Sequence, residues 1–196
     1  MDEKSAISLI EQMIRDTKEE IRSNGFYFLV WGWLVFAAAL ANYYLLEYTA
    51  YVYHSLPWGI AIPAGIILTF VRSFYDRKNT VVRAKSFVDT ILKRTIIAFS
   101  ISMFLVCLTM PAGSQWKAFY PTLMVIYAIW LYLSGSILRF KPLVFGAYMN
   151  WLAAAIGYLW VDHGIHLLLI AFAVLGGFII PGTLLEKRYQ KYVQGT

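Results

Sequence analysis

Six runs of apolar residues dominate this sequence, and each is long enough, or nearly so, to cross a lipid bilayer as a helix. A helix needs about 20 apolar residues to span about 30 Å of hydrocarbon. The runs raise the hydrophobic content to 60% and leave only 14% of residues charged, which excludes soluble, disordered and fibrous folds. The predicted fold is all-α, a polytopic membrane helix bundle with six transmembrane helices at 26–46, 57–72, 95–112, 118–138, 142–161 and 164–185.

Composition divides the chain into three parts. Residues 1–25 are predicted to form an amphipathic cytoplasmic helix, residues 26–186 the six-helix transmembrane domain, and residues 187–196 a short cytoplasmic tail. Within the transmembrane domain, the connection 72–94 carries seven Lys and Arg against two Asp. This segment is therefore predicted to be a basic cytoplasmic connection.

The distribution of positive charge predicts one orientation. With a cytoplasmic N-terminus, 16 of the 17 Lys and Arg residues fall on the cytoplasmic side, and only Lys117 falls outside. Cytoplasmic loops of membrane proteins are enriched in Lys and Arg, so both termini are predicted to be cytoplasmic in a multi-pass protein of a bacterial inner membrane. The net charge of +6 then follows from topology, and no nucleic-acid partner is expected.

Tyr and Trp residues are expected to form a belt at the outer interface, where a ring can be apolar at one end and hydrated at the other. The predicted belt comprises Tyr43, Tyr44, Tyr48, Tyr51, Tyr53, Trp58, Trp116, Tyr120, Tyr158 and Trp160.

The N-terminal segment, residues 2–24, has the pattern of a docking helix. Its apolar residues recur at helical spacing, and it carries four Lys and Arg against six Asp and Glu. A helix that lies on anionic lipid is normally basic, so a protein surface is the favoured partner. That surface is either the connection 72–94 of the same chain or a separate protein. The predicted docking residues are Ile7, Ile10, Met13, Ile14 and Ile21.

The predicted spans contain few polar side chains. No Asp, Glu, Lys or Arg lies centrally in any span, which disfavours a carboxylate-based proton pathway. The polar side chains at depth are expected to hydrogen-bond to neighbouring helices. They are Asn42, Ser100, Ser102, Thr109, Ser134, Ser136 and Asn150.

One group of residues has the chemistry of a metal site at the outer side. His163 and His166 are three residues apart at a helix start, and His54 or Asp162 would supply a third ligand. Interfacial histidines without a metal are the favoured interpretation, because no recognised ligand motif is present. No cofactor is therefore expected. The absence of catalytic motifs also predicts that the chain is not an enzyme.

Two segments carry a resemblance to known proteins. The first runs from Leu9 to Met13 and on through Asn24 to Trp33, and the second is GSILRFKPLVFGAYMNW at 135–151. Both resemble a group of small uncharacterised membrane proteins of Bacteroidota-type bacteria. The resemblance implies an inner-membrane location and brings no catalytic or binding residue with it.

The sequence favours a non-enzymatic interaction or regulatory component that docks through its cytoplasmic helix. The alternative is a small-solute transporter or channel, which six spans with internal Gly and Pro would suit. A metalloenzyme at the outer face is a third interpretation. The lipid bilayer is an expected partner, and homo-oligomerisation is left open.

Overall fold

A computed structural model describes residues 25–49, 52–78, 87–108, 116–159 and 162–194. The described chain is helical and contains no strand. Six of its spans are long and apolar enough to cross a membrane, which confirms the predicted all-α bundle. The elements are α2 (Phe26–Tyr48), α3 (Leu56–Lys78), α4 (Phe87–Leu108), α5 (Trp116–Ile137), α6 (Lys141–Leu159), α7 (His163–Val174), the π-helix η1 (Leu175–Ile179) and α8 (Ile180–Gln194).

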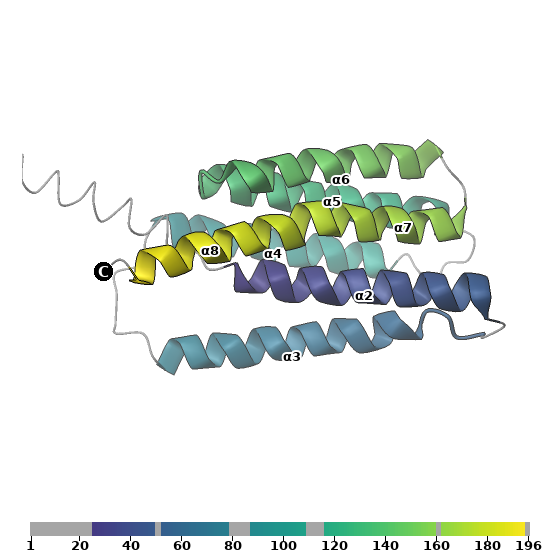
Figure 1. Cartoon of the computed structure of the whole chain (residues 1–196), viewed down its shortest axis with the longest axis horizontal. Coiled ribbons are helices and arrows are strands. Elements are labelled where there is room, and N and C mark those ends of the chain that lie inside the picture. The colour runs from purple at the N-terminus through teal and green to yellow at the C-terminus, as the bar shows by residue number, and fades with distance from the viewer. Residues whose placement is uncertain (1–24, 50–51, 79–86, 109–115, 160–161, 195–196) are drawn as a thin grey trace, which may run out of the picture.

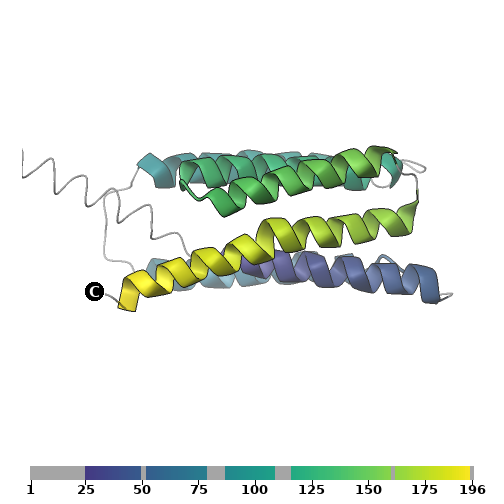
Figure 2. The same ribbon diagram turned by 45° about the horizontal axis from the view of Figure 1, so that its top comes forward.

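Successive spans run in alternate directions, so the bundle has two distinct ends (Figure 1). α7, η1 and α8 form one bent helix that lies between α2 on one side and α5 and α6 on the other (Figure 2). The core lies where these helices meet. Its fully buried side chains include Met124, Leu131, Leu143, Leu167 and Ile170.

α3 and α4 lie at the periphery of the bundle. α3 packs on α2, where the Trp31 indole N–H donates to the Thr69 hydroxyl at 3.1 Å and the Arg72 guanidinium lies 5.0 Å from the Phe26 ring centroid. α4 packs on α5 through Phe99, whose ring centroid lies 5.3 Å from that of Trp130. No residue of the Thr90–Leu108 span is buried. The apolar outer faces of both helices are therefore presented to lipid.

The C-terminal span bends at η1, where the local hydrogen bonds widen to π-helical spacing. Pro181 lies two residues after the π-helix, at the second position of α8, and cannot donate a backbone hydrogen bond to the preceding turn. Gly176 and Gly177 lie inside the π-helix, which places little side-chain bulk at the bend. Proline and π-helical turns are established causes of helix bending, and both occur here.

The turn between α5 and α6 is a helix C-cap with an unusual residue. The Phe140 N–H donates to the Gly135 carbonyl at 2.8 Å and the Arg139 N–H donates to the Ser136 carbonyl at 3.3 Å, which is the Schellman pattern. Arg139 occupies the left-handed position with φ 47°, where glycine is usual. This cap sends α6 back antiparallel to α5 at the same end of the bundle.

The helices differ from the predicted spans chiefly at one end. α3 continues to Lys78 rather than residue 72, α4 begins at Phe87 rather than residue 95, and α8 continues to Gln194 through the segment predicted as a tail. The apolar run in the sequence predicts only the part of a helix that lies inside the hydrocarbon. The helix itself can extend further into water, because its backbone hydrogen bonds do not depend on the bilayer. Much of the predicted connection 72–94 is thus the polar ends of two helices.

Candidate functional site

At the end of the bundle where α2 ends and α3 begins, Asn42 links two helices. It is completely buried, and its side chain lies 3.1 Å from Nδ1 of His54. The amide orientation that satisfies its neighbours has the nitrogen donating to the His54 carbonyl at 2.8 Å and the oxygen accepting from the Trp58 indole N–H at 2.9 Å. Asn42 therefore fixes the turn that precedes α3.

His163 and Tyr120 complete this polar cluster. The His163 ring lies edge-on to His54 at a centroid distance of 5.8 Å, and its Nε2 lies 3.4 Å from the Tyr120 hydroxyl. Tyr120 is only 1% exposed and packs near Trp58, with ring centroids 6.4 Å apart. The prediction that placed Tyr120 in an interfacial belt is wrong, because it lies on the face of α5 that turns into the bundle. Tyr44, Tyr48, Tyr53 and Tyr158 are exposed, as a belt requires.

The other two predicted metal donors have separate structural roles. His166 is buried, and its Nε2 hydrogen-bonds the Gly157 carbonyl at 2.7 Å, which joins α7 to α6. The Asp162 carboxylate accepts from the Ile165 N–H at 3.1 Å and caps α7. Four residues were candidates for the metal site: His54, Asp162, His163 and His166. Of these, only the His54 and His163 side chains have their rings in contact with each other. Among the described residues, no three His, Cys, Asp or Glu side chains are arranged to hold a metal.

A second buried polar site lies at the bend of the C-terminal span. The Asn150 amide donates to the Gly146 carbonyl at 2.9 Å and to the Ala173 carbonyl at 3.0 Å. The second bond joins α6 to α7, as was expected of polar residues at depth. The expectation fails for Ser100, which donates to the Ile96 carbonyl of its own helix, and for Ser134, whose buried hydroxyl has no partner. The Asn150 side-chain oxygen is buried and has no hydrogen-bond partner. The site thus has a free acceptor beside a π-helix, an element often found at functional positions.

At the opposite end of the bundle, the start of α2 is fixed against α8. The Gly25 N–H donates to the Glu186 carboxylate at 3.1 Å. Gly25 is buried, and a Cβ there would collide with the Gly182 carbonyl oxygen and lie 3.0 Å from the Glu186 nitrogen. A side chain at residue 25 would therefore separate the two helices, so glycine is required for this contact.

This end of the bundle carries nearly all the positive charge of the described helices. We name it the basic end. The helix directions place there Arg72, Arg77, Lys78, Lys93, Arg94, Arg139, Lys141, Lys187, Arg188 and Lys191, whereas Lys117 begins α5 at the opposite end. The predicted segregation of charge is therefore present in the fold. The assignment of the basic end to the cytoplasm stays a prediction.

The predicted docking residues Ile7, Ile10, Met13, Ile14 and Ile21 lie outside the described residues. Their nearest described neighbour along the chain is Gly25, so the segment joins the bundle at the basic end beside α8.

The sequence pointed to some of these side chains and missed others. Asn42 and Asn150 stood out as the amides in apolar spans. Tyr120 did not, because an aromatic residue near a span end fits an interface as well as a core. The Gly25–Glu186 contact joins residues 161 positions apart, and no local pattern signals it.

Six membrane-length helices with lipid-facing apolar surfaces define an integral, multi-pass membrane protein. Comparison with known proteins found no matching family model, no matching curated protein and no matching solved structure.

Proposed function

We propose that the chain is a non-enzymatic interaction or regulatory component of a bacterial inner membrane, and that it docks a protein partner through residues 2–24. The observation that carries this proposal is the fixed junction between Gly25 and α8. The bond to Glu186 and the close approach to Gly182 hold the first residue of the bundle in one place. The chain therefore enters the bundle at one defined point at the basic end.

Charge supports the same proposal. Residues 2–24 carry four Lys and Arg against six Asp and Glu, and they leave the bundle at an end rich in Lys and Arg. Attraction between the two would hold the helix near the membrane surface in low salt. Its apolar stripe would then bind either the chain's own connection 72–94 or a second protein.

Photo-cross-linking in native membranes tests this proposal. A photoreactive residue replacing Met13 should capture one protein partner. Capture of the chain's own connection 72–94 would instead establish an internal clamp and contradict partner docking. Ile10→Asp with Ile14→Asp should abolish capture, because two charges would enter an apolar contact. The matched control is Ser8→Asp with Gln12→Asp, which adds the same charge on the opposite face of the helix and should preserve capture. Capture of lipid alone would contradict docking.

A small-solute transporter or channel is the second candidate function, and the bend at η1 favours it. Discontinuous helices with free polar groups form the binding sites of many transporters, and the Asn150 side-chain oxygen is such a group. Swelling of proteoliposomes in glycerol and in urea tests this function. Faster swelling that Asn150→Leu removes would establish a solute path, whereas rates equal to empty liposomes would reject a path for these solutes.

A further inference from the structure

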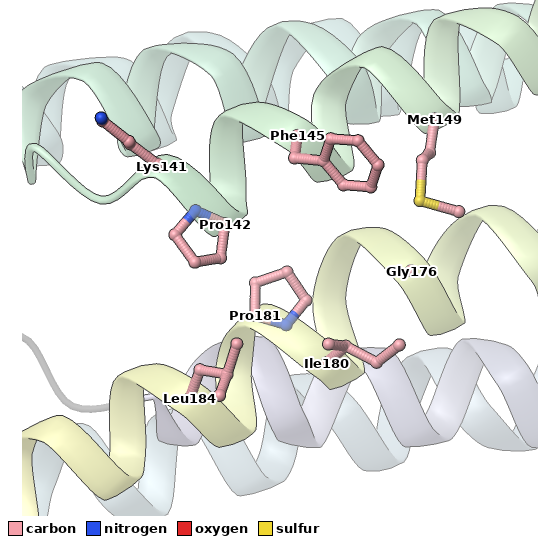
Figure 3. A pocket seen from close by; sticks show the side chains of 8 residues that line it. All are labelled: Lys141, Pro142, Phe145, Met149, Gly176, Ile180, Pro181 and Leu184. Carbon is pink, nitrogen blue, oxygen red and sulfur yellow. The ribbon is translucent and has the colours of Figure 1, made fainter.

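A groove of about 380 Å³ opens on the outer surface of the bundle between α6 and the bent C-terminal span. Figure 3 shows its two walls facing each other along their length. Pro142, Phe145 and Met149 come from α6, and Gly176, Pro181 and Leu184 come from η1 and α8. The bend at η1 carries α8 away from α6, and the Met149 side chain packs against Gly176 at the closed end of the groove, where a Cβ would lie 2.6 Å from Met149 Cε. The groove therefore widens from the π-helix toward the start of α6.

The dimensions of the groove match one leaflet of a bilayer. Lys141 and Met149 mark its two ends on α6, and eight residues of helix rise about 12 Å. Half of the hydrocarbon core is about 15 Å. The Phe145 and Ile180 side chains are 66% and 51% exposed, so the groove opens toward the surrounding lipid. An extended acyl chain has the shape and polarity that such a groove accommodates.

Positive charge lies at only one end of the groove. Lys141 is the one charged residue among its lining residues, and its side chain extends toward the end of the bundle where α6 begins (Figure 3). The Arg188 guanidinium lies 5.9 Å from the ring of Phe140, the residue before Lys141. The Glu186 carboxylate is directed to Gly25 instead. Two exposed cations therefore lie at the level where phospholipid phosphates would lie.

We propose that this groove binds one anionic phospholipid, with an acyl chain between α6 and α8 and the phosphate against Lys141 and Arg188. An apolar channel that ends at two cations is complementary to an amphiphile with an anionic head. A transmembrane helix of another protein would complement the apolar walls but not the paired charges. The site lies on the lipid-facing side and is separate from the proposed docking segment.

Native mass spectrometry of the full chain in mild detergent tests the headgroup contact. Phosphatidylglycerol and phosphatidylcholine with identical acyl chains are the probes. The wild type should retain one phosphatidylglycerol in preference to phosphatidylcholine. Lys141→Gln should lower retention about fivefold, and Lys141→Gln with Arg188→Gln about 25-fold. Lys93→Gln with Arg94→Gln removes two positive charges from the same end of the bundle on α4, which contributes no residue to the groove, and it should change retention less than twofold.

A second variant tests the acyl contact without changing charge. Ile180→Trp places a large ring in the exposed mouth of the groove, and it should lower phosphatidylglycerol retention at least tenfold while the unfolding temperature without added lipid stays unchanged. Equal retention of the two phospholipids, or equal retention by the charge variant and its control, would overturn the proposal. A dimer that Ile180→Trp dissociates, with no lipid retained by the wild type, would also overturn it and assign the groove to a second copy.

Discussion

Gly146 on α6 faces Gly177 in η1 so closely that a Cβ on Gly146 would lie 2.6 Å from the Gly177 Cα. The obstacle is backbone, which cannot rotate away as a side chain can. Small residues at helix contacts are the usual means by which membrane helices approach this closely. The same contact brings Asn150 within reach of the Ala173 carbonyl. Close packing at these two glycines thus accompanies both the bend at η1 and the buried hydrogen bond beside it.

Gly146→Ala is expected to lower the free energy of unfolding by about 1 to 3 kcal/mol, because inserting a methyl group here forces two backbones apart. Thermal unfolding in detergent measures the loss. Gly59→Ala is the matched control, since nothing lies within 4 Å of a Cβ at that position on α3. It should leave stability unchanged or raise it by about 0.5 to 1 kcal/mol, because alanine favours helix over glycine. Equal effects of the two substitutions would contradict the close contact.

Ser134→Ala is expected to leave stability unchanged or to raise it by about 1 kcal/mol. The Ser134 hydroxyl is completely buried and has no hydrogen-bond partner, so its removal relieves a desolvation cost. Asn150→Ala should act in the opposite direction, by about 0.6 kcal/mol for each bond lost plus the cost of the space left behind. Chemical unfolding in detergent compares the two. A larger loss from Ser134→Ala than from Asn150→Ala would contradict this assignment.

Glu186→Ala is expected to destabilise the junction at the start of α2 by about 1 to 3 kcal/mol, because the Gly25 N–H would lose its charged acceptor. Glu186→Gln keeps a side-chain oxygen and should retain most of the stability. Lys187→Ala controls for a change of charge at the next position. Hydrogen exchange at the Gly25 amide provides the measurement, and protection that persists in Glu186→Ala would show that another group accepts this bond.

The sequence was sufficient to predict the class of fold and the segregation of charge. Apolar runs and the placement of Lys and Arg are local properties that depend on the bilayer rather than on tertiary contacts. Helix ends were predicted less well, as α4 shows by beginning at Phe87. The first turns of α4 contain charged residues, which end the apolar run but continue the helix.

The contacts that form the candidate sites could not be predicted without the three-dimensional arrangement of the helices. His54 and His163 were predicted to lie at one end and do meet there, but a three-residue spacing did not reveal that His166 turns to Gly157. The π-helix follows from Gly176, Gly177 and Pro181 only together with α6 packed against them. The groove between α6 and α8 could not be predicted, because neither helix alone encloses a space.

The orientation of the bundle gives the last prediction. Positive residues are retained on the cytoplasmic side during insertion, so the basic end should be protected in intact cells. In a Cys107→Ala background, Tyr53→Cys should react with a membrane-impermeant maleimide, because Tyr53 is 69% exposed at the end opposite the basic end. Lys191→Cys lies exposed on α8 at the basic end and should react only after lysis. Labelling of Lys191→Cys in intact cells, with Tyr53→Cys protected, would invert the topology. It would place the basic end and the docking segment outside the cytoplasm, and the groove in the outer leaflet of the membrane.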